Sequence, residues 1–253
     1  MSVVTPSIRN RSTLAERLDL IVSPLFALLL AIIGWAVWFY SDLDSTTLSI
    51  LEPSKLQRQL GETVALGLAS SAAGIIVAIP IGILVTRKGF PRLKSFLVNT
   101  LGLGQSLPVY GLIVIYFSWL GAGAFTVLLA LATYSLLPIL RNTIVGLEQV
   151  DKSVIDAARG MGLTSRQILT KIELPLSVVV ILAGIRTAVV INVGFASLAF
   201  LVGGGGLGET INSGLKNGRD PAILIGAVLV AVLALSFDFL SALAQKYMKP
   251  KGL

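Results

Sequence analysis

The sequence predicts an all-α integral membrane protein with six transmembrane helices. Of its 253 residues, 55% are apolar and 13% are charged, about half the charged share of an ordinary globular chain. Long uncharged stretches separate clusters of Lys and Arg, and a helix needs about 20 residues to cross a bilayer. Although the net charge is +7, this pattern indicates a lipid bilayer as the partner and no nucleic acid.

The chain contains neither cysteine nor histidine. Without cysteine there are no disulfides, thiolate ligands or cysteine nucleophiles, and without histidine the commonest general base and zinc ligand is missing. The sequence also lacks G-x-x-x-x-G-K-[ST], so it has no P-loop to hold nucleotide phosphates. We therefore expect no covalent catalysis, no metal and no cofactor.

The spans follow from the gaps between charges. Uncharged stretches cover residues 20–41, 63–86 and 95–140, which are 22, 24 and 46 residues long. The longest can hold two helices, and Gly121-Ala122-Gly123 is its natural turn. Two later apolar stretches, each interrupted by one charge, complete the set. We place the six spans near residues 21–41, 63–86, 96–118, 124–147, 176–201 and 222–245.

Six spans put both termini on one side of the membrane. Of the 20 Lys and Arg residues, 15 fall on the side of the termini and one within a span. Only four fall on the other side: Lys55, Arg58, Lys216 and Arg219. Because basic residues concentrate in cytoplasmic segments, we expect both termini in the cytoplasm. The first apolar stretch has no obvious small-residue cleavage site before Asp42, so we interpret it as a retained helix and not as a signal peptide.

The segment of roughly residues 148–175, on the predicted cytoplasmic side, has a helical pattern. Asp151 is a candidate N-cap, and Thr164 with Gln167 fits a capping box. Gly160 and Gly162 interrupt the pattern between them. We expect two short amphipathic helices joined by a glycine bend. By composition alone, helices that merely rest on lipid headgroups explain this segment equally well.

The same segment resembles the EAA loop of ABC transporter permeases, E-A-A-x3-G-x9-I-x-L-P. The matching residues are Asp156, Ala157, Ala158, Gly162, Ile172, Leu174 and Pro175. Every spacing agrees, and the one departure is Asp156 where the family has Glu. The resemblance implies that these residues, together with Gly160, form a coupling helix that sits in a groove of a separate ATPase subunit.

Further runs resemble the osmoprotectant branch of these permeases, which imports glycine betaine, carnitine, choline and proline betaine. They are 137–143, 158–162, 173–176, 183–188 and 205–208. The resemblance implies a type I ABC importer (MetI-like) transmembrane core over residues 61–245. Residues 1–60 would add an N-terminal cytoplasmic segment, the first helix and an outer loop, and residues 246–253 a short basic cytoplasmic tail.

The resemblance also implies partners and a location. The permease would work in the bacterial cytoplasmic membrane with a cytoplasmic ABC ATPase dimer and an extracytoplasmic substrate-binding protein. A second permease subunit, identical or related, would complete the translocation path. Three alternatives remain at this point: an ABC permease for methionine or another amino acid, an ion-coupled secondary transporter, and a membrane scaffold without transport activity.

Polar and aromatic residues within the spans are candidates for the substrate path: Gln105, Ser106, Tyr110, Tyr134 and Asn192. Gln105-Ser106-Leu107-Pro108 resembles the Q-T-I-P of the osmoprotectant branch, although Val109-Tyr110 departs from its pattern and leaves the exact substrate open. A quaternary ammonium cation could lie against an aromatic face. The alternative for each residue is hydrogen bonding between helices.

A glycine-rich run, Gly203-x-Gly205-x-x-Gly208, literally satisfies the dinucleotide-binding pattern. A lipid-length apolar stretch precedes it where a dinucleotide site needs a strand, so we do not interpret it as a nucleotide site. In the resembling family this segment, which includes Gly206, lies near the outer gate and the binding protein. We expect a flexible loop there.

Two charges, Arg186 and Asp238, lie within membrane depth. Counted from the cytoplasmic ends of their spans, they fall within roughly one helical turn of each other. They could neutralise each other or reach towards the inner surface, or they could serve substrate passage.

Prolines and small residues predict how the spans bend and pack. Pro80, Pro108 and Pro138 fall inside predicted spans, so we expect local kinks. Small residues at 74, 78 and 82 form a stripe that permits close helix contact, either within one subunit or between two.

Overall fold

The computed structural model describes residues 8–87 and 89–248, with side chains from residue 21 onward. Of the predicted basic cytoplasmic residues, Lys88, Lys249 and Lys251 and the side chains of Arg9, Arg11 and Arg17 lie outside this range. The described elements are α1 (Ile8–Tyr40), α2 (Ser45–Ile50), α3 (Pro53–Val85), α4 (Pro91–Ser106), α5 (Val109–Leu120), α6 (Ala124–Glu148), α7 (Lys152–Gly160), α8 (Ser165–Ile168), the π-helical turn η1 (Leu169–Glu173), α9 (Leu174–Phe195), the 3-10 helix η2 (Ala196–Val202), α10 (Gly208–Asn217) and α11 (Asp220–Met248).

Five of the described helices are long and apolar enough to cross a membrane, and the bent pair α4 and α5 adds a sixth span if it counts as one. The all-α class is confirmed, and the predicted count of six spans is confirmed if α4 and α5 together form one span. The turn predicted at Gly121-Ala122-Gly123 is also found, because α5 ends at Leu120 and α6 begins at Ala124.

The third span differs from its prediction. A local kink was expected at Pro108, but α4 and α5 meet at 100°. Leu107 takes an extended conformation with φ −73° and ψ 137°, because the ring of a following proline disfavours helical geometry. Pro108 also has no N–H with which to continue the ladder. The chain therefore changes direction sharply at this point.

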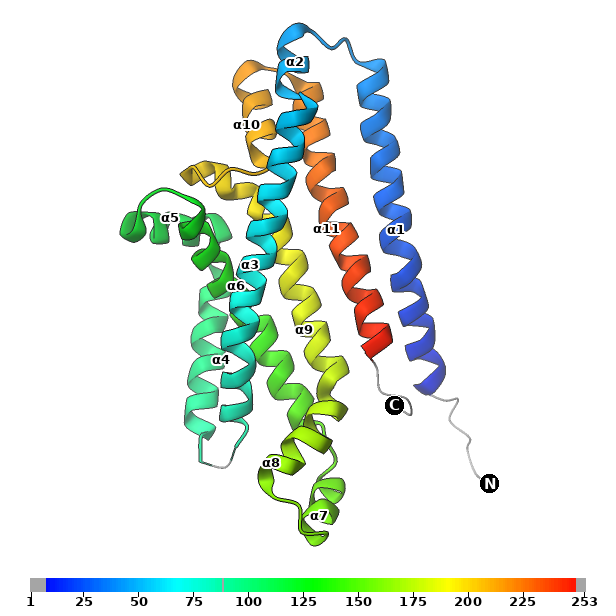
Figure 1. Ribbon diagram of the computed structural model, residues 1–253, viewed down its shortest axis with the longest axis vertical. Helices are drawn as coiled ribbons and strands as arrows, with labels where there is room; N and C mark the ends of the chain where they lie inside the picture. The colour runs from blue at the N-terminus through cyan, green and yellow to red at the C-terminus, as the bar shows by residue number, and fades with distance from the viewer. Residues whose placement is uncertain (1–7, 88, 249–253) are drawn as a thin grey trace.

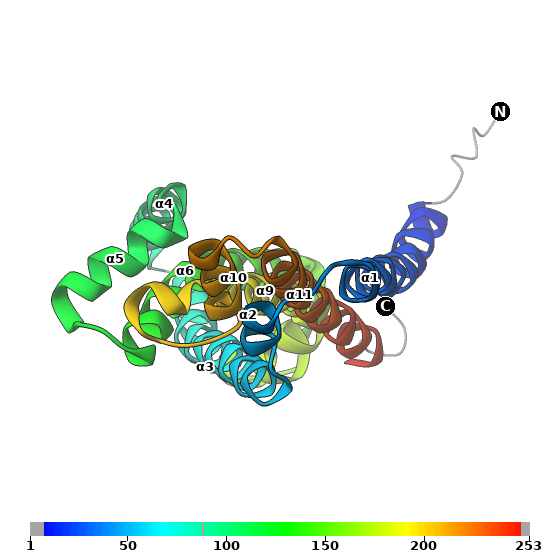
Figure 2. The same ribbon diagram turned by 90° about the horizontal axis from the view of Figure 1, so that it is seen from above.

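The central helices are α3, α6 and α9, which pack against one another. On one side α11 packs along α9 and α1 along α11; on the other side α4 and α5 pack against α6 (Figures 1 and 2). Helices α7 and α8 form one end of the molecule, which we call the elbow end; α2 and α10 form the opposite end, the loop end (Figure 1). The start of α1 and the end of α11 point towards the elbow end.

The stripe of small residues on α3 lies against α6. A Cβ atom added to Gly74 would lie 2.6 Å from Oγ of Ser135, and one added to Gly82 would lie 2.7 Å from Cγ2 of Thr143. Ala78, between them, is buried. The stripe therefore packs within the chain. Of the two predicted roles for these residues, the contact between two subunits is wrong.

Candidate functional site

The elbow end is built by local hydrogen bonds that the sequence predicts. Asp151 accepts a hydrogen bond from the backbone N–H of Ser153, at 2.8 Å, and so caps α7. This hydrogen bond lowers the pKa of the Asp151 carboxyl. Thr164 and Gln167 form a complete capping box at the start of α8. Between the two helices Gly162 has φ +81°, a backbone conformation that favours glycine, so the predicted bend is confirmed.

Most of the EAA-like residues lie on an accessible surface. Asp156, Ala157, Gly160 and Gly162 are exposed, whereas Ala158 is buried. Asp156 pairs with Arg159, one turn further on, at 3.1 Å. The elbow projects from the end of the molecule (Figure 1), and Met161 at its bend is 72% exposed. Another protein can therefore reach this surface.

The second predicted short helix is not separate from the span that follows. α8 continues through η1 directly into α9, and the N–H of Leu174 bonds the carbonyl of Leu169, five residues earlier. Pro175 accounts for this wide turn, because a proline ring clashes with the carbonyl four residues before it and offers it no donor. Ile172 and Leu174 are partly buried here, and Pro175 is exposed.

Two of the candidate path residues come together. The side-chain amide of Gln105 donates to the carbonyl of Tyr134 at 3.1 Å. The ring of Tyr134 meets that of Phe195 edge to face, with centroids 5.9 Å apart. Phe195 was not among the candidates; it ends α9, where the helix tightens into η2. Ser106 bonds back to its own helix, and Tyr110 is 53% exposed on α5.

Asn192, also a candidate path residue, is fully buried. Its amide is satisfied when its nitrogen faces the carbonyl of Leu131 at 3.1 Å and its oxygen faces the hydroxyls of Ser71 and Ser135 at 3.1 and 3.2 Å. Ser71 belongs to α3, Leu131 and Ser135 belong to α6, and Asn192 itself lies on α9. The structure therefore places Asn192 between the central helices and away from any accessible surface, because a buried amide requires partners.

The two intramembrane charges lie in direct contact. Nε of Arg186 donates to Oδ1 of Asp238 at 2.6 Å, and Nη2 donates to Oδ2 at 2.7 Å. Ser23 of α1 donates to the same carboxylate at 2.6 Å. This forked geometry is the stronger form of an Arg–carboxylate pair, and it joins α9, α11 and α1.

The glycine-rich loop at the loop end is held by α3. The N–H of Gly206 donates to Oε2 of Glu62 at 2.8 Å, and the N–H of Leu207 donates to Oγ1 of Thr63 at 2.9 Å. Gly205 and Gly206 have φ +78° and +93°, and a Cβ atom added to Gly205 would lie 2.4 Å from the Glu62 carboxylate. A 3-10 helix precedes the loop. The loop is thus fixed by hydrogen bonds, contrary to the expected flexibility.

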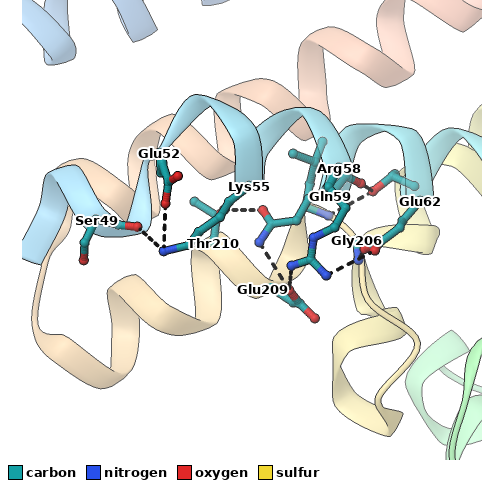
Figure 3. A network of polar contacts seen from close by, with 11 residues as sticks. Ser49, Glu52, Lys55, Arg58, Gln59, Glu62, Gly206, Glu209 and Thr210 are labelled. Carbon is teal, nitrogen blue, oxygen red and sulfur yellow. Dashed lines mark hydrogen bonds and ion pairs between the residues drawn. The ribbon is translucent and has the colours of Figure 1, made fainter.

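A polar network surrounds this contact (Figure 3). The buried amide of Gln59 accepts from Thr210 at 2.5 Å and donates to Glu209 at 3.2 Å. Arg58 lies 3.5 Å from Glu62 and 3.7 Å from Glu209. Sequence reasoning missed these α3 residues, although their spacing of three and four places them on one helical face.

With this geometry described, comparison with known proteins identifies the chain. Residues 78–251 match the family described as binding-protein-dependent transport system inner membrane component. The chain belongs to this family. It is therefore a multi-pass inner-membrane permease that works with an ATPase and a binding protein and does not itself hydrolyse ATP. The interpretations as a secondary transporter and as a scaffold are set aside.

Several curated permeases are similar over most of their length. The carnitine transport permease protein OpuCB of Listeria monocytogenes is 39% identical over 188 residues, 74% of this chain and 85% of that protein. The glycine betaine/carnitine/choline permease OpuCB of Bacillus subtilis is 38% identical over 201 residues, 79% and 91% of the two chains. The osmoprotectant import permease OsmY of Salmonella typhimurium is 38% identical over 176 residues, 70% and 75% of the two chains.

A solved structure shares the fold of the permease. A chain of the inward-facing MetNI methionine ABC transporter superposes with a TM-score of 0.68 at 24% sequence identity, covering 79% of this chain and 99% of that one. This likeness confirms the predicted type I importer architecture. At this level of identity it says nothing of the substrate.

Proposed function

We propose that the permease forms the translocation path for a small quaternary ammonium solute, namely glycine betaine, carnitine, choline or proline betaine. The observation that carries the proposal is its 38% identity over 201 residues to the glycine betaine/carnitine/choline permease of Bacillus subtilis. Permeases named for carnitine and for choline alone are similar at 39% and 35%. Glycine betaine, carnitine and choline, the solutes in these names, share a trimethylammonium group.

The elbow is proposed to be the surface on which a cytoplasmic ATPase dimer docks. Two features support this: Asp156, Ala157, Gly160 and Gly162 are exposed, and α8 continues through η1 into α9 without an intervening loop. Motion of a docked ATPase that reaches α8 would therefore pass into a central span along continuous helix. The accessible basic residues near this end, such as Lys152 and Arg166, agree with a cytoplasmic location.

The path is proposed to pass the break between α4 and α5. There Gln105 and Tyr134 meet, with Ser106 and Tyr110 beside them, and Phe195 adds an aromatic ring. Ring faces attract quaternary ammonium cations. A second permease subunit, identical or related, would close the path from the other side. At the loop end, the loop carrying Gly203, Gly205, Gly206 and Gly208 would form the outer gate and meet the binding protein.

Reconstitution tests the substrate and the source of energy together. The permease is incorporated into liposomes with its ATPase and binding protein, and uptake of radiolabelled glycine betaine, carnitine, choline and methionine is measured. We expect ATP-dependent uptake of at least one of the first three and none of methionine. Uptake of methionine alone would contradict the substrate proposal. Uptake that survives without ATP but stops when an ionophore dissipates the ion gradient would contradict ATP coupling.

A further inference from the structure

Glu173, the last residue of the π-helical turn η1, is a buried carboxylate outside the proposed path and gate. Its side chain is 9% exposed, and its Oε2 lies 2.8 Å from Nη1 of Arg87. Arg87 follows the end of α3. An unpaired buried charge is strongly unfavourable, so the two residues hold the base of α9 to the end of α3.

Both partners are fixed to their own helices. Nε of Arg87 donates to the carbonyl of Ile83 at 3.2 Å, and its Nη2 donates to the hydroxyl of Thr86 at 3.3 Å. The carbonyl of Glu173 accepts from Oγ of Ser177, 2.6 Å away, which also lies 2.8 Å from the carbonyl of Gly146 on α6. The pair therefore connects two helices, with the Arg87 side chain held at the end of α3 and the Glu173 backbone held at the start of α9.

The wide turn explains why this glutamate faces inwards. One extra residue in a turn rotates the positions beyond it by about 100° relative to an α-helix. Within η1, Thr170 and Lys171 are exposed, while Glu173 is buried and faces Arg87. The turn that carries the elbow into α9 is thus also the turn that presents Glu173 to Arg87.

The contact is an ion pair without a well-aligned hydrogen bond. Oε2 of Glu173 is one of two buried side-chain atoms in the described part of the chain that lack a hydrogen-bond partner, although Arg87 lies at ion-pair distance. Nε and Nη2 of Arg87 donate instead to Ile83 and Thr86, at the end of α3. Charge attraction therefore supplies the link, and neutralising either residue removes it.

We propose that Glu173 and Arg87 are positioning residues of the transport cycle, which join the elbow to α3 so that α3 and α9 move as one unit. The inference rests on the proposed function in one respect, namely that an ATPase docks on the elbow. It adds that the ATPase drives α3 as well as α9. Because α3 also holds the glycine-rich loop through Glu62 and Thr63, the link reaches from the elbow end to the loop end.

Glu173→Gln tests the charge, and Glu148→Gln is the matched control. Glu148 also forms an ion pair at the elbow end, with Lys94, but its side chain is 48% exposed and lies outside η1. In reconstituted complexes we measure co-purification of the ATPase, ATP hydrolysis and uptake of the three solutes per ATP. We expect Glu173→Gln to assemble and hydrolyse ATP with uptake per ATP reduced at least about fivefold. The control keeps the wild-type ratio, and so does the charge swap Arg87→Glu/Glu173→Arg.

If Glu173→Gln takes up as much solute per ATP as Glu148→Gln, the inference is overturned. It is also overturned if the charge-swap variant assembles but does not restore uptake per ATP. Failure of the wild-type permease to bind the ATPase would instead contradict the proposed function.

If Glu173→Gln does not fold, the movement of α3 relative to α9 can still be measured in a chain that keeps Glu173 and Arg87. The chain has no cysteine, so Leu84→Cys on α3 and Leu176→Cys on α9 carry the only spin labels. With one labelled copy per complex, their distance should stay constant when ATP binds; a change refutes joint movement.

Discussion

Asn192 is a single buried amide on which three helices converge. Asn192 lies on α9 and its partners come from α3 and α6, so this candidate path residue is placed where it holds the central helices together. The sequence supplies only a polar residue within an apolar span, and that signal is shared by path residues and by hydrogen bonds between helices. Whether such a residue lines the path or bonds a neighbouring helix depends on the residues that face it. For Asn192 these lie 57 or more positions away, so no local pattern encodes them.

Asn192→Leu should therefore lower stability without changing transport by the molecules that fold. Interhelical hydrogen bonds in membranes contribute about 0.6 kcal/mol each, so losing several partners costs about 1–2 kcal/mol. Thermal unfolding of the purified permease measures the loss, and uptake is normalised to folded protein. Asn99→Leu, at an exposed position on α4, is the control and should be neutral. A large fall in uptake per folded molecule would return Asn192 to the path.

Gly67 illustrates the same dependence on distant neighbours. A Cβ atom added to it would lie 2.7 Å from Cγ2 and 2.8 Å from Cα of Val193 on α9, whereas one added to Gly61, on the same helix, would meet nothing within 4 Å. Gly67→Ala should cost about 1–3 kcal/mol through overpacking. Gly61→Ala should gain up to about 1 kcal/mol through helix propensity. Equal melting temperatures for the two variants would contradict the close packing of α3 on α9.

At the scale of elements, the caps and turns followed from the sequence, and the irregular helices did not. Asp151, the Thr164–Gln167 box and Gly162 act through residues two or three positions away, so their effects can be read locally. Pro108 signals a departure from helix but not its size, since the 100° bend is set by what α4 and α5 pack against. Pro175 likewise fits a helix start and a π-helical turn equally well.

The Arg186–Asp238 pair links three elements, and its energy can be tested by a double-mutant cycle. Each side chain is about one-fifth exposed in the described part of the chain. Removing one member leaves a charge at membrane depth and should cost about 3–5 kcal/mol, whereas removing both is often close to neutral. We expect Arg186→Leu and Asp238→Leu to be unstable singly and the double variant to recover most of the loss. Additive losses in unfolding experiments would show that the two residues act independently.

At the scale of the whole molecule, charge spacing predicted five of the spans in their order, and it placed a sixth where the structure has the bent pair α4 and α5. Bilayer thickness fixes the length of a span, and the cost of a charge in lipid marks its ends. The contacts of α3 with the glycine-rich loop and α10 were missed because the two partners of each contact lie 144 or more positions apart. The fold alone leaves the direction of the molecule in the membrane open, and the distribution of basic residues predicts it.

We predict that the elbow end faces the cytoplasm, because the basic residues outside the spans concentrate there. The cysteine-free chain allows a direct test. Leu215 on α10 is 62% exposed at the loop end, and Tyr247 near the end of α11 is 78% exposed towards the elbow end. In right-side-out vesicles a membrane-impermeant maleimide should label Leu215→Cys directly and Tyr247→Cys only after permeabilisation, while the parent chain stays unlabelled. The reverse pattern would invert the topology and place the elbow beyond the reach of a cytoplasmic ATPase.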